Sequence, residues 1–200
     1  MRIIGGHCAG LILKAPAGLG VRPTPDLVRQ AIFNSLGDRV AGARVLELFG
    51  GTGALSLEAL SRGAAEATCI ELSRKHARYI EDNYARTGLP PGRFRMRVQD
   101  VFSALPQLAA AGTQFDLILA DPPFGEKNVG RRSTSLSQRL LDSPDLPRLL
   151  APGGRFVLGH TRRDTLTLTP AWQEVKEMRH GDSMMRFLEV HRQESVVLSQ

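Results

Sequence analysis

The residue run Asp116–Phe124, DLILADPPF, combines a strand-like apolar stretch with groups able to bind a polar ring. Proline has no backbone N–H to donate to a β-ladder, so Pro122 and Pro123 must leave the sheet directly after Asp121. Open α/β sheets bind ligands at the carboxyl ends of their strands. We therefore expect the Asp121 carboxylate, the Pro122 carbonyl and the Phe124 ring to face a flat ligand with N–H groups to donate. A nucleobase with an exocyclic amine fits that description.

A second candidate element is the stretch VLELFGGTGAL, which has the pattern of a strand, a glycine-rich turn and the start of a helix. Gly50, Gly51 and Gly53 lack a Cβ atom, so the backbone there can come close to a ligand. The turn nearly matches the dinucleotide fingerprint, but Ser56 stands where its third glycine belongs. Glu47 would also repel a pyrophosphate. A dinucleotide is therefore disfavoured.

Acidic side chains at or near the ends of three successive strands predict a different ligand. Glu47 suits the cationic amino acid end of a ligand. Glu71, about twenty residues beyond the turn, is placed to accept hydrogen bonds from a ribose. Asp100 ends the third strand, where it can accept from an adenine amine. S-adenosylmethionine has all three parts. Each carboxylate alone is more commonly a helix cap or a solvated strand end, but three in register favour binding. The predicted cofactor-binding residues are Glu47, Phe49, Gly50, Gly51, Gly53, Glu71, Leu72, Asp100, Val101 and Asp121.

The elements that must position these residues alternate between short apolar strands and amphipathic helices. Such alternation predicts right-handed βαβ units and a mostly parallel α/β sheet covered on both faces. A turn at Gly181-Asp182 makes the last two strands an antiparallel hairpin at the sheet edge. The expected strands are Arg44–Phe49, Ala67–Glu71, Arg95–Val98, Phe115–Ala120, Arg155–Gly159, Trp172–Arg179 and Met184–Val190. The expected helices are Pro25–Leu36, Gly53–Arg62, Ser73–Thr87, Phe102–Ala110 and, interrupted at Pro144, Leu136–Leu150.

The segment before this alternation predicts a small appendage. Two short apolar runs around a glycine turn within Met1–Val21 indicate a hairpin. Thr24 is a good N-cap residue, Pro25 suits the first helical position, and Asp26 favours the positive end of the following helix. We therefore expect a hairpin and helix appendage over residues 1–36, a main domain over 37–193 and a tail over 194–200.

The bulk composition is that of one globular domain with a short appendage: 200 residues, 42% hydrophobic and 23% charged. The N-terminus lacks the apolar stretch of a signal peptide, and no run is long enough to span a bilayer. Cys8 and Cys69 lack metal-ligand spacing and indicate reduced thiols in a cytosolic protein. The five histidines are scattered and predict no metal site. A net charge of +6 favours a polyanionic partner, although a merely basic enzyme is equally compatible with it.

Five short motifs are spread along the chain: RIIGG from Arg2, RPTPD from Arg22, ELFGGTGAL from Glu47, EALSRG from Glu58 and DPPF from Asp121. Together they resemble the bacterial RsmD family, class I methyltransferases that act on guanine N2 of small-subunit ribosomal RNA. The similarity extends from the first residues through Gly181-Asp182. Members often carry an aspartate-initiated DxFAGSG where this chain has ELFGGTG, a conservative change that leaves the cofactor type undisturbed.

The resemblance implies a Rossmann-like class I methyltransferase fold with a seven-stranded sheet, and methyl transfer from S-adenosylmethionine to guanine N2 of 16S ribosomal RNA. The implied substrate is of the guanine 966 type, within a small-subunit particle. The implied catalytic residues are Asp121, Pro122, Pro123 and Phe124. Asp121 and the Pro122 carbonyl would accept the two amine hydrogens and so aim the nitrogen lone pair at the methyl group. Phe124 would stack on a base flipped out of its stack.

Basic residues near this face are candidates for phosphate contact. A loop over Gly125–Ser133 and a second arm near the N-terminus supply them, with solvated surface charge as the alternative. The arginines of the strand RFRMRV share one strand face, where they more simply protect a sheet edge. The predicted RNA-binding residues are Arg2, Lys14, Arg22, Lys127, Arg131 and Arg132.

Two alternatives to this function stay open. An adenine-N6 DNA methyltransferase would use the same Asp-Pro-Pro-Phe chemistry but normally needs a target-reading domain. A non-catalytic assembly factor would keep the fold without turnover, yet it would not need Asp121 and the glycine turn. The leading expectation is a monomeric cytoplasmic enzyme that uses no metal and no membrane.

Overall fold

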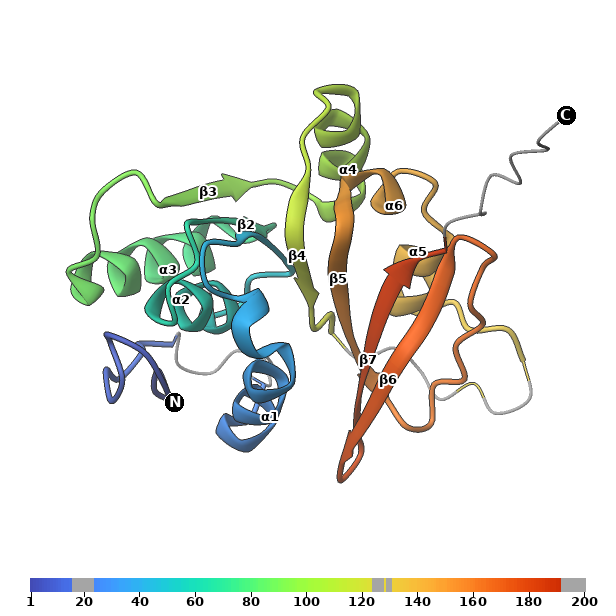
Figure 1. Cartoon of the computed structure of the whole chain (residues 1–200), viewed down its shortest axis with the longest axis horizontal. Coiled ribbons are helices and arrows are strands. Elements are labelled where there is room, and N and C mark those ends of the chain that lie inside the picture. The colour runs from blue at the N-terminus through green and yellow to red at the C-terminus, as the bar shows by residue number, and fades with distance from the viewer. Residues whose placement is uncertain (16–23, 124–127, 129–130, 192–200) are drawn as a thin grey trace, which may run out of the picture.

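The computed structural model describes residues 1–15, 24–123, 128 and 131–191. Its strands are β1 (Arg44–Leu48), β2 (Glu66–Glu71), β3 (Phe94–Val98), β4 (Phe115–Ala120), β5 (Leu150–Thr161), β6 (Trp172–His180) and β7 (Ser183–Val190). They form a seven-stranded sheet in the order β3-β2-β1-β4-β5-β7-β6 (Figure 1). Strands β1 to β5 pair in parallel, and β7 runs antiparallel to β5 and β6. The predicted α/β fold with an antiparallel C-terminal edge is confirmed.

Helices pack on both faces of this sheet. They are α1 (Asp26–Leu36), the short 3-10 turn η1 (Gly37–Arg39), α2 (Ala54–Ser61), α3 (Arg74–Thr87), α4 (Val101–Ala110), α5 (Leu136–Asp142) and α6 (Leu146–Leu149). One apolar cluster joins α4, α5 and α6 to the strands, and a second joins α1 and α2 to them. The central strands β1 and β4 are buried on both faces, as parallel strands covered by helices must be.

The segment predicted as one interrupted helix over Leu136–Leu150 is two separate helices, α5 and α6. The chain leaves α5 at Ser143, whose extended backbone precedes Pro144. Residues before proline are driven out of the helical region, so the break falls where the sequence indicated an interruption. Strand β5 also begins earlier than expected, at Leu150 instead of Arg155, through a register shift against β4.

The N-terminal segment lies against α2 (Figure 1). The expected hairpin is present, within the described residues, as one antiparallel bridge between Arg2 and Ile12. The buried Glu58 carboxylate accepts hydrogen bonds from the N–H groups of Ile4, at 2.7 Å, and Gly5, at 2.9 Å. The EALSRG motif therefore anchors the N-terminal segment to the main domain.

Helix α1 begins one residue later than predicted, and the expected role of Thr24 is wrong. Pro25 takes the N-cap position, and no side chain caps the helix. Thr24 lies one residue before the cap, and its hydroxyl donates to Asp121 at the end of β4. Asp26 does lie in the first helical turn, as predicted. Within the described residues, no helix has both the length and the apolar character needed to cross a membrane.

Candidate functional site

A cavity of about 600 Å³ opens where β1, β2, β3 and β4 end. Its size falls in the range of small-molecule sites, roughly 300–1,000 Å³. Among the predicted residues, those that line it are Phe49, Gly51, Glu71, Leu72, Asp100, Val101, Asp121, Pro122 and Pro123. The remaining wall is made by His76, Phe102, Leu136 and Arg139, which the sequence did not single out. Residues from four strand ends thus meet in one space.

The glycine turn after β1 has unusual backbone geometry. Phe49 has φ of 61°, the only positive value for a non-glycine residue in the described chain. Such strain costs about 1–3 kcal/mol and is typical of functional sites. A Cβ atom on Gly50 would lie 2.4 Å from Cys69 Sγ, and one on Gly53 would lie 2.6 Å from Ile80 Cγ2. These two glycines let the turn pack against β2 and α3, whereas Gly51 faces the cavity.

Glu71 connects the glycine turn to the start of α3. Its two carboxylate oxygens accept from the backbone N–H of Gly51 and of Ser73, each at 2.8 Å. His76 Nδ1 lies 3.5 Å from the same carboxylate. A carboxylate has about four lone-pair positions, so these contacts leave capacity for ligand hydroxyl groups. Glu71 therefore lines the cavity with acceptor capacity for a ligand, and its contact with a ribose stays a prediction.

Glu47 does not line the cavity. Its buried carboxylate accepts from the backbone N–H of Leu55, at 3.3 Å, and of Ser56, at 3.0 Å, and from the Ser56 hydroxyl. Burial raises the pKa of the Glu47 carboxyl to about 7, and hydrogen bonds from Ser56 oppose part of that shift. Glu47 thus caps the positive end of α2, the alternative role considered for each lone acidic residue. Its contact with a cationic amino acid group stays a prediction.

Asp100 both caps a helix and faces the cavity. Its Oδ1 accepts from the backbone N–H of Ser103 at 3.0 Å, which fixes the start of α4. Next to it, the rings of Phe49 and Phe102 meet edge to face with centroids 6.2 Å apart. The Arg139 guanidinium carbon lies 3.8 Å from the centroid of the Phe102 ring, a cation–π contact. The cavity therefore has an aromatic wall beside an acidic group.

Asp121 stands directly after β4 and lines the cavity. Thr24 Oγ1 donates to its Oδ2 over 2.5 Å. A Cβ atom on Gly159 of β5 would come within 2.3 Å of its Oδ1. Phe124, the predicted stacking residue, lies outside the described residues, so its role stays a prediction.

The predicted RNA-contacting residues are only partly described. Arg2 is largely exposed, with Asp26 3.9 Å away. The Lys14 backbone pairs with the Asn83 side chain through two 2.8 Å bonds. Arg131 is exposed, and Arg132 forms a 2.7 Å ion pair with Asp142. Arg22 and Lys127 lie outside the described residues.

The contacts of two arginines on β3 agree with the expected role of protecting a sheet edge. This strand is at the sheet edge. Arg95 pairs with Glu66 at 3.1 Å, and Arg97 donates to Gln107 at 3.3 Å. Charged side chains on an edge strand oppose pairing with another chain.

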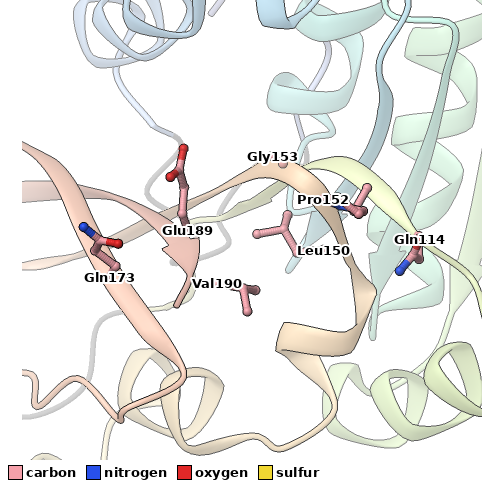
Figure 2. Close-up of a pocket in the computed structure, with 9 residues that line it drawn as sticks. Gln114, Leu150, Pro152, Gly153, Gln173, Glu189 and Val190 are labelled. Atoms are coloured by element: carbon pink, nitrogen blue, oxygen red, sulfur yellow. The ribbon is translucent and has the colours of Figure 1, made fainter. Parts of the chain in front are cut away.

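A second cavity, of about 510 Å³, lies at the other end of the strands, by the starts of β4 and β5 and the end of β7 (Figure 2). Glu189 is the acidic residue that lines it, and it is paired with Arg155 at 2.5 Å. Ligands of open α/β sheets bind at the carboxyl ends of the strands, so the cavity beside Asp121 is the candidate site. In the described part of the chain, no three His, Cys, Asp or Glu side chains are grouped to hold a metal ion.

The sequence of this chain is similar to those of known proteins. A family model described as conserved hypothetical protein 95 matches residues 1–189. Ribosomal RNA small subunit methyltransferase D of Escherichia coli is 42% identical over 124 residues, which span 62% of this chain and 60% of that protein. Putative rRNA methyltransferase YlbH of Bacillus subtilis is 34% identical over 169 residues, which span 84% of this chain and 87% of that protein.

The fold is also similar to a solved structure. The putative methyltransferase yhhF from Escherichia coli superposes with a TM-score of 0.76 at 32% identity. That match covers 96% of this chain and 99% of the solved chain. The family model, which matches residues 1–189, includes both the N-terminal segment and the antiparallel edge.

Proposed function

Because this chain belongs to the conserved hypothetical protein 95 family, the RsmD family that its motifs indicated, we propose that it is an S-adenosylmethionine-dependent ribosomal RNA methyltransferase. The proposed reaction transfers a methyl group to the exocyclic N2 of a guanine in 16S ribosomal RNA. The observation that carries it is that Asp121 and Pro122 share one cavity with Gly51, Glu71 and Asp100. The residues proposed to accept the guanine amine therefore lie next to the residues proposed to bind the nucleoside part of the cofactor.

The described residues fit the proposed cofactor. Glu71 has acceptor capacity for the ribose hydroxyls, and Asp100 can accept from the adenine amine. Leu72, Val101 and Phe102 supply apolar surface for the adenine ring. The glycine turn lies between these groups and Asp121. When bound, S-adenosylmethionine supplies a methyl group on a positively charged sulfur.

Asp121 and Pro122 at the end of β4 suit an amine that is a poor nucleophile. The lone pair of guanine N2 is delocalised into the ring, so the nitrogen must pyramidalise before it can attack. The Asp121 carboxylate and the Pro122 carbonyl accept its two hydrogens and hold the lone pair toward the methyl donor. Asp121 then accepts the proton that methylation makes acidic. Catalysis in this proposal is positioning followed by one proton transfer.

The charge of the chain supports a nucleic acid substrate. Exposed Arg2 and Arg131, and the net charge of +6, favour contacts with the phosphates of a nucleic acid. A base buried in a duplex cannot reach Asp121, so the target guanine must be unstacked and turned toward the cavity. Guanine 966 in a small-subunit particle is the proposed target, and the enzyme is proposed to act as a monomer in the cytoplasm.

Transfer of a labelled methyl group tests this function. Labelled S-adenosylmethionine is offered with unmodified small subunits, naked 16S ribosomal RNA or duplex DNA, using the wild type and Asp121→Ala. We expect label in guanine N2 of the ribosomal substrate with the wild type alone. Label in DNA only would instead support an adenine-N6 enzyme. Cofactor binding with no transfer to any substrate would support an assembly factor.

A further inference from the structure

We infer that Thr24, which lies just before α1, is a positioning residue for Asp121, and that Arg29 supports it. This inference rests on the proposed function, because it concerns the carboxylate that would accept the guanine amine. It adds to the RNA-contacting role expected of the N-terminal region. The residues involved are far apart in sequence and meet only in the fold.

The hydrogen bond between Thr24 and Asp121 is partly buried. Thr24 Oγ1 donates to Asp121 Oδ2 over 2.5 Å, and Thr24 is only 9% exposed. A hydroxyl that donates to one carboxylate oxygen restricts rotation of the carboxylate plane. It uses only one of about four lone-pair positions of the carboxylate. Thr24 can therefore fix the direction in which Asp121 accepts.

The backbone of Thr24 is itself held by a buried arginine. Arg29 is fully buried, and its Nη1 donates to the Thr24 carbonyl at 2.8 Å. Its Nη2 donates to Asp26 Oδ1 at 2.9 Å and to the Arg2 carbonyl. Burying a guanidinium destabilises the fold unless its N–H groups find acceptors. An apolar residue at this position of α1 would be buried at a lower free-energy cost. Fixing two backbone carbonyls gives this burial a structural purpose.

The other side of Asp121 is bounded by β5. A Cβ atom on Gly159 would lie 2.3 Å from Asp121 Oδ1, so the carboxylate lies directly over bare backbone. Thr24 on one side and Gly159 on the other leave the carboxylate little freedom to rotate. Methyl transfer that depends on orientation requires such an enclosure, because a small displacement of a reacting group lowers the rate by a large factor.

Substitution at Thr24 separates this role from general packing. Thr24→Val removes the hydroxyl at nearly constant volume, and Thr24→Ser retains it. Loss of a hydrogen bond to a charged group predicts a fall in kcat of about 10-fold to 100-fold for Thr24→Val. The Kd for S-adenosylmethionine should stay unchanged, and Thr24→Ser should restore most of kcat. Thr169→Val is the matched control, since the Thr169 hydroxyl donates to the Leu141 carbonyl at 3.2 Å, away from Asp121.

The outcomes also separate this inference from the proposed function. If Asp121→Asn abolishes transfer while Thr24→Val keeps the kcat of the wild type, the positioning role is overturned and the function stands. If Asp121→Asn transfers methyl groups like the wild type, the proposed chemistry itself fails. Should Thr24→Val fold poorly, Thr24→Ser still decides: a kcat as low as that of Thr24→Ala would contradict the role of the hydroxyl.

Discussion

Gly159 on β5 and Asp121 at the end of β4 are packed so closely that a single added methyl group would reach the carboxylate. The distance from a built Gly159 Cβ to Asp121 Oδ1 is 2.3 Å. The two strands pair in register up to Ala120 and Leu158, so neither backbone can move away easily. Proteins tolerate almost no overlap in such packed regions. The carboxylate would have to rotate or shift.

We therefore predict that Gly159→Ala lowers kcat by about 10-fold to 100-fold, because the Asp121 carboxylate loses its orientation. The Gly159 backbone is not in the left-handed region, so alanine adds no conformational strain of its own. Affinity for S-adenosylmethionine, measured by calorimetry, should stay near that of the wild type. A kcat equal to that of the wild type would show that the carboxylate does not need this position.

Glu71 offers a test of the cofactor site. Glu71→Ala removes the acceptor of the Gly51 and Ser73 N–H groups together with the proposed ribose contact. We expect cofactor affinity to fall by about 10-fold to 100-fold, the effect of losing hydrogen bonds to a charged group. Glu66→Ala is the control on the same strand, since Glu66 pairs with Arg95 on the surface. Equal affinities for the two variants would exclude Glu71 from the site.

Glu47 predicts a pH dependence of stability. The folded-state pKa is about 7 and the ordinary value is 4.5, so between these values the folded protein binds more protons than the unfolded chain. The stabilising effect of protonation is fully present below pH 4.5 and is lost as the pH rises to about 7. The loss is about 3 kcal/mol at most. Above pH 7 this contribution is constant.

Urea unfolding of the wild type and Glu47→Gln from pH 4.5 to 8 measures this effect. Glutamine does not titrate, so the difference in unfolding free energy between the two proteins should change across this window and level off near pH 7. A difference that stays constant from pH 4.5 to 8 would contradict the raised pKa of Glu47.

Glu58 allows a test of the N-terminal segment. Its buried carboxylate accepts from Ile4 and Gly5 and pairs with Arg62 at 2.7 Å. Glu58→Ala leaves these groups without their acceptor, so we expect stability to fall by about 3 kcal/mol or more. RNA affinity should weaken as well, because Arg2, which is proposed to contact RNA, lies on the released segment. Glu81→Ala, at an exposed position of α3, should change neither quantity.

Much of the fold follows from local pattern. Alternating apolar strands and helices predicted the parallel sheet, and Gly181-Asp182 predicted the antiparallel edge. The same pattern predicted that Glu71, Asp100 and Asp121 lie close together, because the carboxyl ends of parallel strands meet at one end of the sheet. These features depend on periodicity and on turn residues, which are local properties of a sequence.

The features that the sequence did not predict are contacts between residues far apart in the chain. Thr24 was expected to cap its own helix, yet its hydroxyl bonds to Asp121, ninety-seven residues away in sequence. Phe102 and Arg139 meet at the cavity wall only because α4 and α5 lie on the same face of the sheet. Arg139 stands between Gln138 and Leu140 in the sequence, and this local pattern gives no signal of a place in the cavity wall. Tertiary packing, and not propensity, selects these residues.

The salt dependence of RNA binding distinguishes the arginines proposed to contact RNA from the arginines of the edge strand β3. Each phosphate contact contributes about 0.7–0.9 to the slope of log affinity against log salt concentration. Arg131→Ala should therefore reduce the slope by about that amount, because this exposed side chain is proposed to contact a phosphate. Arg95→Ala is the control, since Arg95 pairs with Glu66 on the edge strand. Filter binding to 16S ribosomal RNA at several salt concentrations measures both slopes. Equal slopes for wild type and Arg131→Ala would exclude a phosphate contact at that residue, and a reduced slope for Arg95→Ala would extend the RNA surface onto β3.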